Sequence, residues 1–244
     1  MRGDREHSVT EAFVTLADGL VGSFDVVELL NDLTEVCARL LDVASAGLLL
    51  ADDLGVLHVI AATSESTRSL ELFQVQRDEG PCLVCYHTGE ALSIANLPLE
   101  IERWPQFVPA AVKRGFISVH AVPMRLQEDV LGALGLFGTT VGTLNEDDLN
   151  LAQALAHVAS VALVSGNATA DRDRLSHQLQ TTLNSRVYIE QAKGVIAEYS
   201  NISMDEAFAV LRNYSRDHNL KLTDVARATA TRSMPLEEVT GSRY

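Results

Sequence analysis

The spacing of hydrophobic residues changes twice along the chain, and these changes limit the folds that the sequence can adopt. Apolar residues recur every three or four positions in 8–21 and 25–41, which is the spacing of amphipathic helices. Shorter apolar runs separated by turn residues follow, and helical spacing returns in 145–165. The intervening strands are expected at 46–51, 56–62 and 91–94 and in a hairpin, 116–127 and 130–140.

Further helical runs are expected at 67–77 and, with a break, at 101–114. This order of elements favours an α+β domain over residues 8–165, built on an antiparallel sheet with helices on one face or at one end. The chain has 244 residues, of which 47% are hydrophobic, so it has enough apolar material for one or two packed domains.

Several classes of protein are disfavoured by composition. The chain contains no run of 18 apolar residues and no apolar segment near its start, so we expect neither a transmembrane helix nor a secretory signal. Three cysteines are too few for a disulfide framework. The sequence therefore predicts a cytoplasmic protein with reduced thiols and no membrane partner.

The net negative charge of the chain comes entirely from its first two thirds. Residues 1–165 hold 9 basic and 23 acidic side chains, a net charge of −14, whereas residues 166–244 hold 10 of each. An acidic body repels polyanions through its long-range field. If a nucleic acid is a partner, we expect the C-terminal part to bind it.

Three short amphipathic helices are expected in the C-terminal part. The first ends near Ser200, the second begins at Ser203 with the spacing of a capping box to Glu206, and the third begins near Lys221. None of these helices is long enough to be stable alone, so we expect them to pack together. Residues 233–244 are expected to form a flexible tail.

The segment 166–184 is expected to be a helical linker. Its apolar residues are sparse and spaced by four, at Leu175, Leu179 and Leu183, which suits a coiled-coil seam between two chains. With a second stripe at Leu151, Leu155, Val158 and Ala162, this pattern predicts a homodimer. The alternative is a solvated linker helix.

Residues 8–165 resemble a GAF domain, a relative of PAS domains. The resemblance rests on the order of elements and on the run EGPCLVCYHTGEAL, which is similar to a run found in GAF domains of actinobacterial regulators. It implies an antiparallel sheet with flanking helices and a small-molecule or redox signal. It does not identify the ligand.

The C-terminal part resembles an ANTAR domain over about residues 170–232. The resemblance rests on IEQAKGVIAE, MDEAFAVLRNYSRDHN and KLTDVA, which occur in the expected order. It implies an all-α three-helix domain that binds paired RNA hairpins as a dimer and favours an antiterminator over a terminator. The whole chain resembles a GAF–ANTAR transcription antitermination regulator.

Candidate RNA-binding residues are the side chains of this part that lie off the apolar faces of its helices. Cations would contact phosphates, Thr223 offers a hydroxyl group, and Gly194 allows close approach of a backbone. The candidates are Arg186, Lys193, Gly194, Arg212, Arg216, Lys221, Thr223 and Arg227. Tyr214 offers a ring, although a single aromatic residue is more often part of a core.

The N-terminal part holds a few residues that could support chemistry. Cys82 and Cys85 form a CxxC pair, which is a candidate thiol sensor, although two small buried apolar residues are the simpler interpretation. No second CxxC or His-x-x-x-His follows, so a zinc site is not favoured. Haem is not favoured either, because His58, His87 and His120 are isolated.

No nucleophile–base arrangement, phosphate-binding loop or pair of catalytic carboxylates is recognisable, so we expect a regulator and not an enzyme. Two alternatives to RNA binding remain. The three C-terminal helices could act as a DNA-binding helix-turn-helix, although LTDVARATATR offers only two arginines for base contacts. The acidic charge would also suit a module that binds only proteins.

Overall fold

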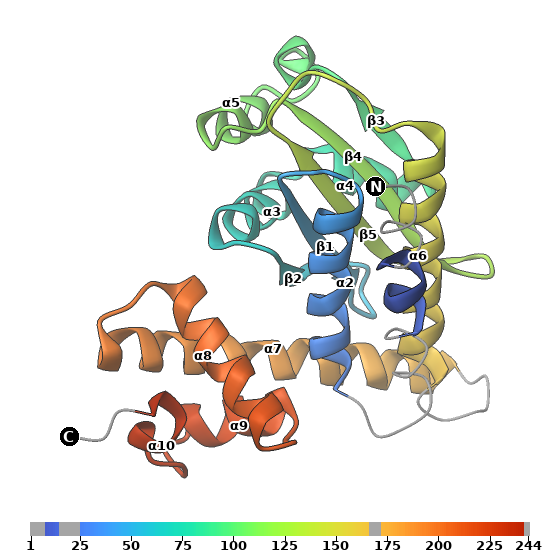
Figure 1. Cartoon of the computed structure of the whole chain (residues 1–244). Helices are drawn as coiled ribbons and strands as arrows, with labels where there is room; N and C mark the ends of the chain where they lie inside the picture. The colour runs from blue at the N-terminus through green and yellow to red at the C-terminus, as the bar shows by residue number, and fades with distance from the viewer. Residues whose placement is uncertain (1–7, 15–24, 166–171, 242–244) are drawn as a thin grey trace.

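The computed structural model describes residues 8–14, 25–165 and 172–241. Residues 8–14 are helical, as expected for the start of the segment 8–21, whose remainder lies outside the described residues. Residues 25–165 form a sheet with helices, here called the sheet domain, and residues 172–241 are helical, here called the helical domain (Figure 1).

The sheet has five strands in the order β2-β1-β5-β4-β3, and all neighbours are antiparallel. The strands are β1 Ser45–Ala51, β2 Leu57–Ala62, β3 Leu92–Ile94, β4 Ser118–Leu126 and β5 Asp129–Gly138. They confirm the predicted strands and hairpin. The hairpin turns one residue earlier than expected, at Gln127, whose φ of 53° is in the left-handed region.

Helices cover both faces of the sheet. Helices α2 Val26–Leu40 and α6 Glu146–Ser165 pack on one face. The other face is covered by α3 Glu65–Arg77, α4 Pro81–Thr88, the 3-10 turn Leu97–Glu100 and α5 Phe107–Lys113. The expectation of helices on one face or at one end was therefore wrong. Strand β1 is buried along its whole length, with no alternation of polar residues, so both of its faces require cover.

The helical domain consists of α7 Arg172–Ser200, α8 Met204–Asp217, α9 Leu222–Ala230 and α10 Leu236–Thr240. The first three confirm the predicted helices, and the Ser203–Glu206 capping box is present at the start of α8. The C-terminal residues differ from the expected flexible tail, because α10 buries Val239 in the core of the helical domain. Figure 1 shows α7 crossing the direction of α6, so these are two separate helices.

The predicted dimer seam is used within the chain. Leu155, Ala162 and Leu179 are buried in the core between the sheet, α2 and α6. Leu151, Val158 and Leu183 are partly buried against the same core, and the side chain of Leu175 lies outside the described residues. The described side chains of the two stripes therefore pack within the chain and do not form the predicted seam between two chains.

We predict that Ser203→Ala lowers the stability of the chain by about 1 kcal/mol, because the Glu206 backbone N–H loses its bond to Ser203 Oγ. Thermal or chemical unfolding measures the loss. Ser203→Asn is the matched control, since asparagine also caps helices well and should retain most of the stability. Equal losses in the two variants would contradict a capping role.

Candidate nucleic-acid interface

The structure divides the candidate RNA-binding residues into a buried and an exposed group. Arg186 and Lys193 on α7 and Arg212 on α8 are only 8%, 4% and 7% exposed. They lie where the helical domain meets the sheet domain, beside Glu35, Glu65 and Arg68. These three candidate cations are therefore not open to RNA phosphates in this structure.

An acidic face of α2 contacts the cations of α8. The carboxylates of Asp25, Glu28, Asp32 and Glu35, here called the α2 acidic face, recur every three or four residues and so lie on one side of the helix. Arg212 pairs through its two terminal nitrogens with Asp32 and Glu35. Arg216 Nε lies 2.9 Å from Glu28, and its Nη2 lies 2.9 Å from Asp32.

The same face reaches the start of α9. Asp25 caps α2 with Oδ1, which accepts a bond from the Val27 backbone N–H at 3.0 Å. Its second oxygen accepts a bond of 2.7 Å from the backbone N–H of Thr223. Val27, at the beginning of α2, is 1% exposed and belongs to the core of the helical domain. Docking therefore combines apolar burial with several charged contacts.

A second contact joins the N-terminal end of α3 to α7 and α8. Lys193 Nζ lies 3.1 Å from Glu65 of α3 and 3.2 Å from Glu190 of its own helix. The backbone N–H of Glu65 donates to Asp205 of α8 at 3.0 Å. Lys193 therefore has carboxylate partners from both domains.

Arg186 is buried, but only part of its guanidinium group has hydrogen-bond or ion-pair partners. Its Nη2 pairs with Glu190 at 2.6 Å, and Arg68 of α3 reaches the same carboxylate at 3.1 Å. Nε and Nη1 of Arg186 have no hydrogen-bond partner among the described residues. Burial lowers the pKa of Arg186 to about 10, and the nearby Arg68 acts in the same direction.

Four of the candidates are exposed, namely Gly194, Arg216, Lys221 and Arg227, although Arg216 pairs with the α2 acidic face, and Thr223 is half-buried. Gly194 is exposed, and a Cβ atom added there would meet nothing within 4 Å in the described structure. Lys221 and Arg227 are exposed at the start and on the outside of α9, and Arg227 pairs with Asp224 at 2.7 Å. Tyr214 is part of the core, and its ring stacks on His218.

The α2 acidic face was missed in the sequence analysis. The spacing of its four acids was visible, but a row of acids on a helix is usually solvated. Arg212 and Asp32 are separated by 180 residues, and Lys193 and Glu65 by 128. No local pattern connects residues so far apart.

The candidate thiols are inside the sheet domain. Cys82 and Cys85 are free and buried on α4. Burial raises the pKa of Cys85 to about 12, and burial together with the charge of Glu71 raises the pKa of Cys82 well above its ordinary value. The reactive thiolate is therefore disfavoured, which argues against a thiol sensor.

Glu71 is a buried acid next to Cys82. Its carboxyl accepts a bond of 2.6 Å from the Gln74 side chain and lies 3.6 Å from Cys82 Sγ. Gly47 of β1 and Gly135 of β5 leave room for it, because a Cβ at either position would lie within 2.7 Å of Glu71 Oε1. Burial raises the pKa of Glu71 to about 8, so the carboxyl is mostly protonated at neutral pH.

Two of the three histidines considered as haem ligands bond to other side chains, and the third is exposed. His58 pairs with Asp52 at 2.9 Å, His120 bonds to Ser93 at 2.5 Å, and His87 is exposed. Within 8–14, 25–165 and 172–241, no group of three or more His, Cys, Asp and Glu side chains is arranged to hold a metal ion. Among the same residues, no helix is both long and apolar enough to cross a membrane.

Comparisons with known proteins agree with this architecture. The family model of the GAF domain matches residues 25–164, and that of the ANTAR domain matches residues 177–228. The chain is a GAF–ANTAR protein. The sheet domain is its GAF domain, and the helical domain contains its ANTAR domain. A search of curated proteins found no match.

Solved structures resemble the GAF domain. The GAF domain of a phosphoenolpyruvate-protein phosphotransferase from Acinetobacter is 15% identical, with a TM-score of 0.51 over 67% of this chain and 97% of that chain. The corresponding domain from Coxiella burnetii is 14% identical, with a TM-score of 0.51 over 65% of this chain and 94% of that one. At these identities the similarity shows the fold alone.

We predict that Glu71 makes stability depend on pH. The ordinary pKa of the group is 4.5 and the folded value is about 8, so in this window the folded chain holds a proton that the unfolded chain has lost. Stability should therefore fall as pH rises from about 5 to about 8. Thermal melts across this range measure the change of stability with pH. In the variant Glu71→Gln, stability should change less with pH than in the parent chain.

The control Glu102→Gln replaces an exposed acid and should keep the pH dependence of the parent chain. If stability changed equally with pH in all three proteins, Glu71 would not be the source of the pH dependence.

Proposed function

We propose that this chain is an RNA-binding regulator of transcription antitermination and that the structure corresponds to a state in which the GAF domain masks part of the RNA-binding surface. The proposed RNA target is a pair of hairpins in a nascent transcript. The ANTAR domain match supports the RNA-binding role. The observation that supports masking is the α2 acidic face, whose carboxylates occupy Arg212 and Arg216.

Masking follows from competition between carboxylates and phosphates. RNA-binding proteins use arginine and lysine to neutralise backbone phosphates, and each such cation must be free to exchange its partner. In the docked state Arg212 and Lys193 are buried against carboxylates of the GAF domain. The net charge of −14 in residues 1–165 would also repel RNA at close range.

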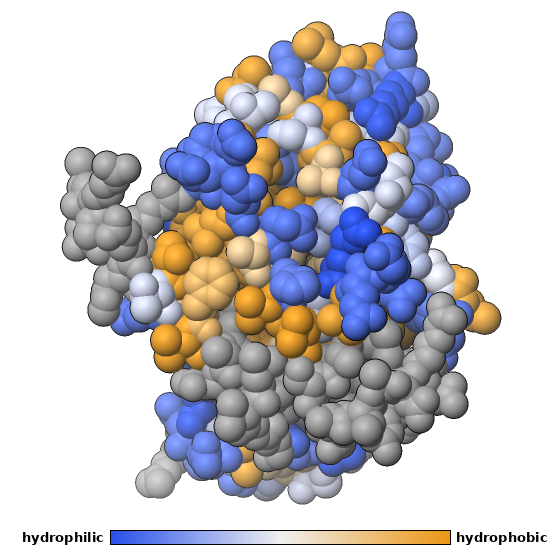
Figure 2. All heavy atoms as spheres, turned by 90° about the vertical axis from the view of Figure 1, so that its right-hand side faces the viewer, coloured by the Kyte–Doolittle hydropathy of each residue, from blue (hydrophilic) through white to orange (hydrophobic). Residues whose placement is uncertain are grey.

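We propose that activation separates α2 from α8 and α9 and that two chains then act together. A homodimer would place two ANTAR domains beside two adjacent hairpins and would raise the effective concentration of the second site. Figure 2 shows hydrophobic side chains gathered beside hydrophilic ones on the side where α6 lies. The proposed role is regulatory, cytoplasmic and not enzymatic.

The proposal is tested by neutralising the α2 acidic face in the full chain. In the triple variant Glu28→Gln, Asp32→Asn, Glu35→Gln, the cations lose their charged partners, so affinity for a two-hairpin RNA should rise about tenfold or more. Fluorescence anisotropy with labelled RNA measures the affinity. Duplex DNA of the same sequence should not bind more tightly than the RNA.

The matched control is Asp53→Asn, Glu102→Gln, Glu128→Gln, which changes the net charge equally at exposed acids elsewhere on the GAF domain. Equal gains in RNA affinity in both triple variants would show that the change in net charge alone causes the effect, which would contradict masking. Failure of every variant to bind RNA, or a preference for duplex DNA, would contradict the proposed function itself.

We also predict that Lys221→Ala and Arg227→Ala each weaken RNA binding without changing the fold, because both side chains are exposed on α9. Removing one cation that binds a phosphate should reduce the slope of log affinity against log salt by about 0.7–0.9. A salt titration measures this slope. The control Arg103→Ala on the GAF domain should leave it unchanged, and an unchanged slope in the α9 variants would exclude phosphate binding there.

A further inference from the structure

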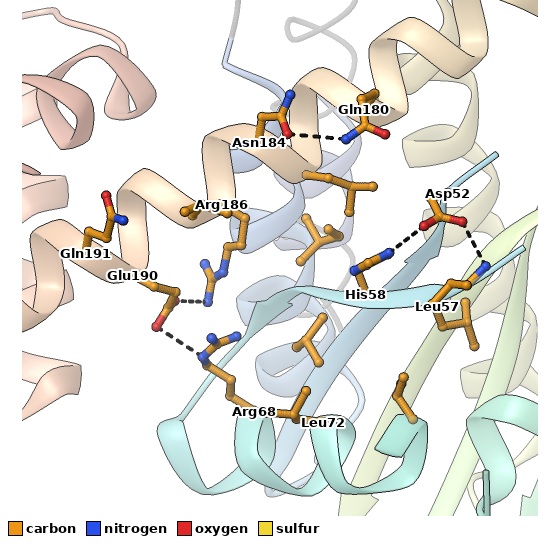
Figure 3. A pocket seen from close by; sticks show the side chains of 16 residues that line it. Asp52, Leu57, His58, Arg68, Leu72, Gln180, Asn184, Arg186, Glu190 and Gln191 are labelled. Carbon is orange, nitrogen blue, oxygen red and sulfur yellow. Dashed lines mark hydrogen bonds and ion pairs between the residues drawn. The ribbon is translucent and has the colours of Figure 1, made fainter. Parts of the chain in front are cut away.

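A cavity of about 620 Å³ lies between the GAF domain and the first helix of the helical domain (Figure 3). One wall is the outer edge of β2, a second is α3, and the third is α7. The edge strand and α3 belong to the GAF domain, whereas α7 leads into the ANTAR domain. The cavity therefore exists in this form only while the two domains are docked.

Most of the cavity wall is apolar. Leu57 of β2, Leu72 and Val75 of α3, and Leu183 and Val187 of α7 contribute to it. Leu72 and Val187 are 41% and 55% exposed, so both leave apolar surface open at the cavity. The volume falls within the range of sites for small organic molecules, so the cavity suits a ligand with an apolar chain or ring.

One end of the cavity carries a buried cation with unused donors. Figure 3 shows Arg186 projecting from α7 into the space between α7 and α3. Its side chain is 9% exposed, and its Nε and Nη1 atoms have no hydrogen-bond partner among the described residues. Both atoms are enclosed by protein atoms in this structure, so a ligand reaches them only when the side chain moves toward the cavity. Buried donors without partners cost free energy, and two adjacent N–H groups of a guanidinium match the two oxygens of a carboxylate, so a carboxylate in the cavity would favour that movement.

The charges at the two ends favour a ligand with one anionic group. Among the residues that line the Arg186 end of the cavity, the guanidinium groups of Arg68 and Arg186 share the single carboxylate of Glu190, which leaves one positive charge in excess. The far end is lined by the Asp52–His58 pair, whose carboxylate would repel a second anionic group.

We propose that this cavity binds an amphipathic monocarboxylate, with its carboxylate on the guanidinium of Arg186 after a small movement of that side chain and its apolar chain or ring along α3 and β2. Because both domains form the walls, such a ligand binds the docked state and not the separated one. By linkage, it therefore shifts the population toward the docked state. The binding site stands independently, whereas the expected effect on RNA rests on the proposed function.

The experiment uses the full chain and octanoate as the probe, with octanol as its uncharged analogue. Isothermal titration calorimetry should show saturable binding of octanoate and binding of octanol at least about tenfold weaker. Arg186→Met, which removes the guanidinium and keeps an apolar chain, should weaken octanoate binding by about tenfold or more. The control Arg77→Met changes an exposed arginine of α3 outside the cavity and should bind octanoate normally.

Leu72→Glu provides a second variant on the opposite wall, where the side chain is already partly exposed, and it should also weaken octanoate binding. The site is overturned if octanol binds as well as octanoate, if Arg186→Met keeps full affinity, or if no saturable octanoate binding is found up to about 1 mM.

The link between the two sites is measured separately. Saturating octanoate should lower the affinity of the full chain for two-hairpin RNA by a factor that Arg186→Met abolishes. Octanoate binding that leaves RNA affinity unchanged overturns the coupling. Octanoate binding in a chain that binds no RNA at all counts against the proposed function and supports the cavity.

Discussion

The docking of α2 determines how the two domains meet. Leu30 and Leu33 of this helix are fully buried in the core of the GAF domain, whereas Val27, one turn away, is buried in the core of the helical domain. The acidic residues of the same helix contact α8 and the start of α9. Helix α2 therefore contributes to two cores. Its position between the domains accounts for the burial of Arg212, and it holds α7 beside the GAF domain, where α7 forms one wall of the cavity.

The energetics of this contact suit a reversible association. Removing one partner of a buried ion pair leaves the other charge uncompensated, which typically costs about 3–5 kcal/mol. When the α2 acidic face separates from α8 as a whole, the carboxylates and the arginines all return to water, so no charge is left buried without a partner. Two domains that meet through a polar interface are generally expected to move relative to each other. A contact built from carboxylates and guanidinium groups can therefore hold the domains together and still release them.

The sequence predicted the positions of helices and strands better than the burial and contacts of individual side chains. Hydrophobic spacing and the Ser203 capping box located the strands and the helices α7 to α9, because these signals are local. The five residues of α10 are too few to show a period. Glu71 lies in a helical run with no clear apolar face, so its burial left no trace in the spacing of hydrophobic residues. The burial of Lys193 and Arg212 depends on acids in a different domain, and residue spacing does not reveal such partners.

The place of Val27 has a consequence for how this architecture can be recombined. Val27 comes from the GAF domain by sequence, since it lies inside the region that the GAF family model matches. By packing it is a core residue of the output domain. A gene fusion that joins a foreign sensor to residues 172–241 would remove a side chain from the output core and leave a hole there. Exchange of the GAF domain for another one is thus expected to require a small apolar residue at the start of the helix that replaces α2.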